Sequence, residues 1–391
     1  MCIRDRFRRG VESANASLYT TLANYDDILV SLIAEVARTY FDLRTFEQRL
    51  VFARENVRLQ KESLDVAAAR FQFGAESELD VSQAKALLKQ TQATIPPLEA
   101  SLRQAKNALA ILLGILPTEI QEILGPPTPI PTVPIEVAVG IPAELLRRRP
   151  DIRLAEFQAA VQSAQIGIAK ADLYPSFSLV GSIGLQSSDK GGIRSNSANF
   201  SDLFTSGGIT YFIGPSFQWP IFNYGRLKNN VRVQDARFQQ LVVSYQNTVL
   251  QAFQDVEDAT VGFLRTQEQA GFLSESVEQY RRSAELSLIQ YSEGLTTYQR
   301  VIDSQRNLTA QEDAFASATG SVGTNLVALY KALGGGWELR LGKDFIPEQT
   351  KDEMRQRTDW GNLLPPEDLP TDREKKPPTG QAVKVFYKPD L

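Results

Sequence analysis

The sequence contains no histidine, and this absence excludes several kinds of chemistry. Without an imidazole the chain cannot form a zinc site of the His/Cys kind, a Ser-His-Asp triad or a Cys-His dyad. Its one cysteine, Cys2, cannot form an internal disulfide, so cysteine usage indicates no redox compartment. No spacing of Asp and Glu singles out an acid–base pair, and no phosphate-binding glycine loop occurs. We therefore expect no catalytic residue, no metal and no cofactor, and an enzyme is a distant alternative.

Excess positive charge and long apolar runs are also missing. The chain has 42 Lys and Arg against 46 Asp and Glu, a formal charge of −4, so it has no general electrostatic basis for binding nucleic acid. No uncharged apolar run approaches the roughly 18 to 20 residues of a transmembrane helix. The basic start, Met1 to Gly10, is not followed by the apolar core of a signal peptide. A membrane role would therefore depend on β-strands.

Proline is absent from two long stretches, residues 11–73 and 226–293, and each is followed by a glycine, Gly74 or Gly294. Apolar residues recur every seven positions in both stretches, which is typical of long helices that supercoil around their neighbours. At 1.5 Å per residue, a helix of this length extends for about 90 Å. The repeating positions are Leu22, Leu29, Val36, Leu43, Leu50, Val57, Leu64 and Phe71, and then Val242, Val249, Val256, Phe263, Ala270, Val277, Ala284 and Tyr291.

The second half of the chain repeats the first at an offset of 220 residues. Phe71-x-x-Gly74-x-x-Ser77 matches Tyr291-x-x-Gly294-x-x-Thr297, and a shorter helical segment follows each motif. Glycine accepts the positive φ that closes a helical hairpin, and a hydroxyl three residues later can cap the returning helix. We therefore predict an internal duplication whose unit is a long helix, a tight turn and a returning helix. The first returning helix, 78–113, is expected to kink at Pro96-Pro97.

Residues 174–188 and 209–222 alternate like two β-strands, joined by a polar loop over 189–208. Each is long enough to cross a bilayer as a tilted strand, with one apolar face and one face of small polar side chains. From two strands alone, a hairpin packed on a soluble core is an alternative. No further strands complete such a sheet, and two strands cannot close a barrel in lipid, so a membrane role requires several protomers to pool strands. The aromatics near the strand ends, expected to form interfacial girdles, are Tyr174, Phe177, Tyr211, Phe217 and Trp219.

These features divide the chain into six segments. They are a first helical-hairpin repeat at 1–114, a Pro-rich connector at 115–142, a short helical segment at 143–173, a transmembrane β-hairpin at 174–222, a second helical-hairpin repeat at 223–334, and an irregular or disordered tail at 335–391. The first repeat lacks the helix and strand pair that precede the second, so we expect an N-terminal truncation of about 80 residues.

Several segments resemble the outer-membrane factor family of TolC-like channels, and more narrowly the NodT-type lipoproteins paired with RND efflux pumps. They are residues 145–153, 164–171, 174–179, 214–222 and 329–337, and the resemblance covers about 11–337. It implies a mainly α fold with a membrane β-hairpin. In this fold, long antiparallel helical hairpins form an α-barrel tunnel, and the strands contribute to a trimeric outer-membrane β-barrel.

The resemblance implies a homotrimer in the Gram-negative outer membrane, in contact with its lipid and extending into the periplasm. There it acts as the passive exit duct for small molecules in a tripartite efflux system, with a periplasmic adaptor (membrane fusion) protein and an inner-membrane RND pump as partners. Relatives of this branch usually carry a signal peptide and a lipidated N-terminal cysteine. Cys2 is not at that position, so lipidation is not inferred.

The resemblance also implies roles for individual residues. The adaptor would dock at the two helical tips, whose residues here are Phe73, Gly74, Ala75, Ser77, Gly294, Leu295, Thr296 and Thr297. Asp303 matches the aspartate ring that constricts the family's pore. The neighbouring ring position, commonly Leu, is Gln299 here, which argues against a hydrophobic gate. The alternative for Asp303 is a solvated carboxylate on a helix face.

Two other functions remain as alternatives. A soluble coiled-coil scaffold would account for the heptads, but the alternating strand pair argues against it. A periplasmic adaptor also contains helical hairpins, but it carries one hairpin within small β-domains, whereas this chain has two hairpins related by a repeat.

Overall fold

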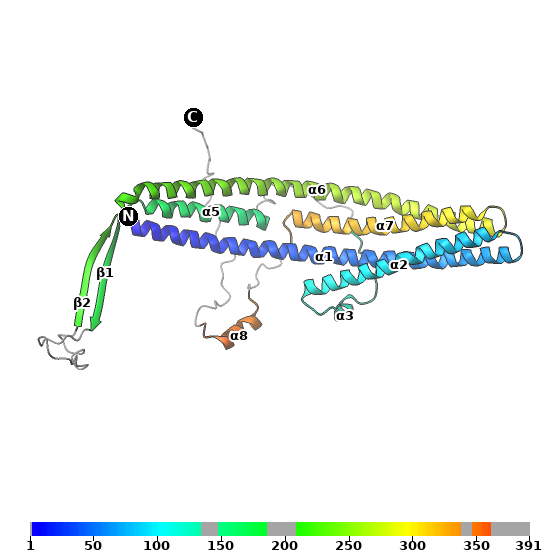
Figure 1. Ribbon diagram of the computed structural model, residues 1–391, viewed down its shortest axis with the longest axis horizontal. Helices are drawn as coiled ribbons and strands as arrows, with labels where there is room; N and C mark the ends of the chain where they lie inside the picture. The colour runs from blue at the N-terminus through cyan, green and yellow to red at the C-terminus, as the bar shows by residue number, and fades with distance from the viewer. Residues whose placement is uncertain (1, 134–147, 186–208, 338–345, 361–391) are drawn as a thin grey trace, which may run out of the picture. The chain divides into compact units, whose positions relative to one another are not determined.

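The computed structural model describes residues 2–133, 148–185, 209–337 and 346–360 (Figure 1). The chain falls into two compact units, residues 1–334 and 335–391, which are described separately. The predicted loop at 189–208, the connector beyond residue 133 and the start of the 143–173 segment lie outside the described residues. The first unit contains α1 (Cys2–Gln72), α2 (Glu78–Leu113), α3 (Ile120–Leu124), α5 (Pro150–Ala171), β1 (Ser176–Leu185), β2 (Ile209–Gln218), the 3₁₀ helix η2 (Ile221–Asn223), α6 (Tyr224–Ser292) and α7 (Tyr298–Ala332).

Two very long helices, α1 of 71 residues and α6 of 69 residues, run through the first unit. α1 extends nine residues upstream of the stretch 11–73, and Gly10 lies inside it. A glycine in a helix interior costs about 1 kcal/mol relative to alanine, which is too little to end so long a helix. α2 likewise continues through Pro96 and Pro97, both of which are exposed. The carbonyls that lose their helical partner there can therefore bind water.

The helices pack as antiparallel neighbours. α1 contacts α2, α5 and α7, while α6 contacts α5 and α7, so α5 and α7 lie between the two long helices (Figure 1). The heptad positions face these neighbours: all are buried or half-buried except Phe71, which is exposed. The buried side chains form several small clusters along the bundle instead of one central core. Such a layered core is what a sustained seven-residue repeat produces.

β1 and β2 form a two-stranded antiparallel hairpin. The register pairs Phe177 with Phe217, Leu179 with Pro215 and Ile183 with Tyr211, so most apolar residues of both strands share one face, with Val180 and Phe212 as exceptions on the other. The other face carries Ser178 opposite Ser216 and Gly184 opposite Thr210 among its pairs. The predicted alternation of faces is therefore present in the paired strands.

Two predicted segments contain short helices that the sequence analysis did not anticipate. The connector contains the short helix α3, because Ile120 is buried in a cluster with Leu43 and Leu109. The second unit, expected to be irregular or disordered, contains α8 (Glu348–Arg357). Glu348 lies in the first turn of α8, and Arg355 and Arg357 lie in its last turn. These charges complement the helix dipole and stabilise a helix that the composition alone did not indicate.

Candidate functional site

The two glycine turns have the same backbone geometry. Gly74 has φ of 72° and Gly294 has φ of 73°, a region that side chains rarely adopt. In each turn the amide after the glycine donates to the carbonyl five residues earlier, at 2.9 Å in the first and 2.8 Å in the second. This bond satisfies one of the carbonyls that a helix leaves unpaired at its end. The shared geometry agrees with a repeated unit, and the duplication itself stays a prediction.

The predicted capping role of Ser77 and Thr297 was wrong in one respect. Both residues occupy the N-cap position with extended backbone, at φ −91° and −83°. Neither hydroxyl makes a side-chain cap hydrogen bond. Both residues therefore start their helices through backbone conformation, and their hydroxyls remain available to other partners.

The two turns lie side by side at one end of the first unit, and Arg70 joins them (Figure 1). Its Nη1 donates to the carbonyl oxygen of Ser292 at 3.0 Å, and its Nη2 pairs with Glu76 at 3.2 Å. The guanidinium also lies over the ring of Tyr291, 5.0 Å from its centroid. A cation over a buried aromatic ring adds attraction to these bonds. One side chain from α1 therefore contacts both its own turn and the end of α6.

A tightly packed aromatic layer supports the turns. Tyr291 and Tyr298 are fully buried with ring centroids 5.0 Å apart, and the Tyr298 hydroxyl lies 2.9 Å from Ser63 Oγ. Burial, together with the nearby Glu76 and Asp80 carboxylates, raises the pKa of Tyr291 to about 12. The outermost apolar side chains of the turns are unpacked: Phe73 is 88% exposed and Leu295 is 77% exposed.

Asp303 is on the opposite side of α7 from the packed core. Its neighbours Ile302 and Ser304 are buried, whereas Asp303 and Gln299 are exposed. Gln299 Nε2 donates to Asp303 Oδ1 at 2.9 Å, across one turn of the helix. The two predicted constriction residues are therefore brought together on the exposed face of α7.

The predicted girdle residues divide between the two ends of the hairpin. The rings of Phe177 and Phe217 pack in a tilted arrangement near the helices, with centroids 5.1 Å apart. There Trp219 Nε1 also donates to the carbonyl of Leu173 at 3.4 Å. Tyr211 pairs with Ile183 near the far end. The two levels are separated by about 20 Å along the strands, which is close to the height of the apolar band of a membrane-spanning strand.

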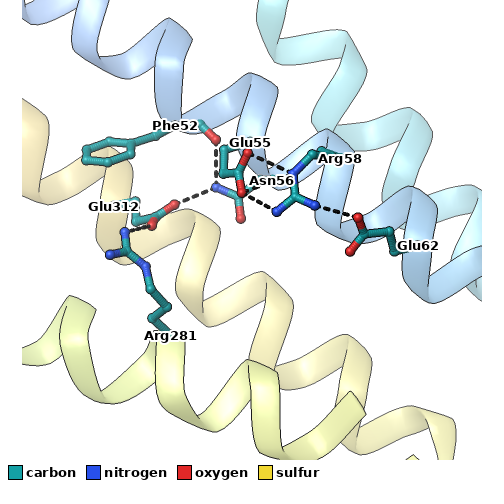
Figure 2. Close-up of polar contacts among 7 residues, drawn as sticks. All are labelled: Phe52, Glu55, Asn56, Arg58, Glu62, Arg281 and Glu312. Atoms are coloured by element: carbon teal, nitrogen blue, oxygen red, sulfur yellow. Dashed lines mark hydrogen bonds and ion pairs between the residues drawn. The ribbon is translucent and has the colours of Figure 1, made fainter. Parts of the chain in front are cut away.

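Sequence reasoning missed a buried polar cluster that joins three helices (Figure 2). The carboxylate of Glu312 on α7 is only 2% exposed. It accepts a hydrogen bond from Asn56 Nδ2 on α1 at 2.7 Å and pairs with Arg281 on α6 at 2.6 Å. Beside it, Arg58 pairs with Glu55 and Glu62 on the exposed face of α1. The available signal was Asn56, which is adjacent to the repeating position Val57, since a polar residue in a helix interface often fixes helix register.

None of the helices that the structure describes combines the length and apolar character needed to cross a membrane. The same described residues contain no group of three or more His, Cys, Asp or Glu side chains positioned to hold a metal ion.

The chain matches known proteins over most of its length. Residues 2–115 and 141–335 match the family described as "Outer membrane efflux protein". The chain belongs to this family.

Individual relatives agree with the family match. Nodulation protein T of Rhizobium leguminosarum bv. viciae is 32% identical over 85% of this chain and 67% of its own length. The solvent efflux pump outer membrane protein SrpC of Pseudomonas putida is 33% identical over 86% of this chain and 69% of its own. Among solved structures, the outer-membrane channel OprN has a TM-score of 0.79 at 34% identity, covering 85% of this chain and 72% of that one.

As a member of the outer membrane efflux protein family, the chain is an outer-membrane efflux channel component of Gram-negative bacteria that extends into the periplasm. The family match includes both helical hairpins and the β-hairpin and ends at residue 335, where the second unit begins. These comparisons do not favour a soluble scaffold or a periplasmic adaptor. The roles of the turns, of Asp303 with Gln299 and of the girdle aromatics stay predictions, as does the division into six segments.

Proposed function

We propose that the chain is one subunit of a homotrimeric, passive exit duct. Three copies would combine their hairpins into a closed sheet in the outer membrane and their helices into a periplasmic tunnel. The duct performs no bond chemistry, and an inner-membrane RND pump supplies the energy. A periplasmic adaptor connects the two by binding the helical turns.

The observation that carries this proposal is the exposure of the hairpin. Every residue of β1 after Ser176, and every residue of β2 except Gly214, is exposed in the single chain. Ile183 is 82% exposed and Tyr211 is 80% exposed. Within the described residues, the outer edge of each strand also has no neighbouring strand. Open edges and unsatisfied backbone groups are not tolerated in lipid, so the hairpins of several copies must pair to enter it.

The oligomeric state of the purified chain tests this proposal. Native mass spectrometry of the chain extracted in detergent should give a trimer. A chain that stays monomeric and fully water-soluble without detergent would contradict the proposal.

Adaptor binding at the turns is supported by their two unpacked apolar side chains. Phe73 and Leu295 are both highly exposed, and the turns that carry them lie side by side (Figure 1), so one partner surface can cover both. Phe73→Asp with Leu295→Asp should abolish crosslinking to the periplasmic adaptor while trimers persist. Phe272→Asp, at a position of α6 that is 66% exposed, is the control and should leave crosslinking unchanged. Normal crosslinking of the double variant would mean that the turns only connect helices and do not bind the adaptor.

A further inference from the structure

Three helix ends, those of α1, α5 and α6, meet where the hairpin begins (Figure 1). Hydrogen bonds between side chains fix the register of these helices. Gln165 Nε2 on α5 donates to Ser13 Oγ on α1 at 3.0 Å. The helices are antiparallel, so five residues further toward the hairpin Lys170 on α5 is level with Arg8 on α1.

The neighbouring helix pair gives the same level. Gln162 on α5 donates to Gln234 Oε1 on α6 at 2.8 Å. Eight residues further toward the hairpin, Lys170 is level with Arg226. Three cations from three helices therefore lie at one level beside the strands.

Carboxylates in the described part of the protein do not neutralise these cations. Arg8, Lys170, Arg226 and Lys228 are all exposed, and no ion pair joins them to a carboxylate in the described part of the chain. The segments 5–12, 170–172 and 224–228 together hold six basic and three acidic residues, a net charge of +3 in a chain of formal charge −4. Like charges at one level repel one another, so internal packing does not explain this arrangement.

The start of α6 also contradicts the electrostatics of a helix. A helix N-terminus carries partial positive charge and favours acidic side chains. The first turn of α6 contains no acidic residue, and Arg226 and Lys228 follow its N-cap, Asn223, which makes no side-chain cap bond. Lys170, in the last turn of α5, agrees with the dipole. Residues that break a local rule without an internal compensation indicate an external partner.

Exposed aromatic residues lie next to these cations. Phe222 is fully exposed, and Tyr174, Trp219 and Tyr224 are each exposed between the strands and the helices. Amphipathic rings followed by Lys and Arg are typical of the boundary between a bilayer and water. The charges and the aromatic residues thus both indicate a surface that lies at the boundary between a bilayer and water.

We propose that Arg8, Lys170, Arg226 and Lys228 form a basic collar that binds the phosphate groups of anionic phospholipids at the periplasmic surface of the outer membrane. This inference rests on the proposed function, because insertion of the hairpin is what brings the collar to that surface. Each cation near an anionic surface changes the partition coefficient by about fivefold. The collar would therefore hold the tunnel at a fixed depth and orientation relative to the membrane.

Vesicle flotation of the full chain tests the collar. One set of vesicles is phosphatidylcholine alone, and the other is an equal mixture of phosphatidylcholine and phosphatidylglycerol. We expect the protein to partition more strongly into the anionic vesicles and this gain to fall as salt screens the charges. In a triple variant, Arg8→Gln, Arg226→Gln and Lys228→Gln, this gain in partitioning should be smaller by a factor on the order of a hundred.

The matched control carries the same change in net charge at exposed, unpaired positions of α1 and α2, as Lys61→Gln, Lys85→Gln and Arg103→Gln. It should keep the gain, as should the charge-conserving variant Arg226→Lys with Lys228→Arg. Circular dichroism of each variant verifies that the helices are intact.

Each remaining outcome overturns the collar in a distinguishable way. Equal gains for the collar and control variants would reject the collar and leave the membrane role of the hairpin intact. Failure to float with either kind of vesicle would reject the collar and the proposed function together. Displacement by inorganic phosphate, beyond that by chloride of the same ionic strength, would assign the cations to a free anion instead of a lipid surface.

Discussion

The guanidinium of Arg70 lies over the ring of Tyr291, with its Cζ 5.0 Å from the ring centroid. Arg70 lies in the last turn of α1 and Tyr291 in the last turn of α6, so this contact joins the ends of the two long helices. The same guanidinium donates to the carbonyl of Ser292. The two helical turns are therefore mechanically coupled through one side chain.

Removing this side chain should loosen the turns. Arg70→Ala deletes the bond to Ser292, the pair with Glu76 and the contact with Tyr291, and should destabilise this end by about 2 kcal/mol. We expect faster amide hydrogen exchange across residues 291–297. Arg54→Ala is the matched control, because its pair with Glu99 is exposed and joins only α1 and α2. Unchanged exchange at 291–297 would show that the turns are held independently of Arg70.

The raised pKa of Tyr291 predicts a loss of stability in strong alkali. Burial favours the neutral phenol, and the pKa is about 12 in the folded state against an ordinary value of 10.0. The contribution of this group is therefore complete below pH 10.0 and lost as the pH rises toward about 12. Denaturation midpoints measured across this range should fall, while the absorbance of the phenolate rises.

Tyr291→Phe should flatten part of this pH dependence. The Tyr291 hydroxyl has no hydrogen-bond partner, so its removal should cost little at neutral pH. Burial also raises the pKa of Tyr298, so a smaller dependence should remain. A profile identical to that of the unmodified chain would mean that Tyr291 does not control alkaline unfolding.

The buried carboxylate of Glu312 depends on Arg281 to compensate its charge. Arg281→Ala leaves this carboxylate with one hydrogen bond from Asn56 and should lower the free energy of unfolding by about 2 kcal/mol. The adjacent Arg282→Ala removes an exposed pair with Glu285 and should cost about 0.5 kcal/mol. Adding Glu312→Leu to Arg281→Ala should restore part of the loss, since no buried charge remains. Equal effects of the two arginine variants in chemical denaturation would contradict this ranking.

The contrast between these sites shows what sequence patterns can and cannot predict. Gly74 and Gly294 were predictable because only a positive φ explains a glycine that ends an uninterrupted helical pattern. Asn56 and Glu312 are 256 positions apart, and their contact depends on how two long helices are aligned. A heptad repeat looks the same after a shift of seven residues, so the pattern leaves that alignment open. The pairing of β1 with β2 was easier, because a shift of one residue would turn every apolar side chain to the other face.

Asp303 should influence ion flow if it lines the constriction of the trimer. Asp303→Ala removes one carboxylate per copy together with its bond from Gln299. We expect higher conductance in planar bilayers, because fewer charges repel one another around the axis. We also expect a weaker preference for cations, because the carboxylates that attract them are removed. Glu278→Ala, at an exposed position of α6, is the control for a lost carboxylate elsewhere. Unchanged conductance and selectivity would leave Asp303 as a solvated carboxylate on a helix face.

The two faces of the hairpin should respond oppositely to the same charge. Leu179 belongs to the apolar face, between the two girdle levels, and its neighbour Ser178 belongs to the other face, although both are exposed in the single chain. If the apolar face meets lipid, Leu179→Lys should destabilise the assembled hairpin by about 2 to 4 kcal/mol near the bilayer centre, whereas Ser178→Lys should be tolerated because its face meets water. The fraction of heat-stable oligomer recovered from outer membranes measures both effects on one gel. If the two lysines lowered recovery equally, the division into a lipid face and a water face would be wrong, and the hairpin would have to bind a partner on both sides.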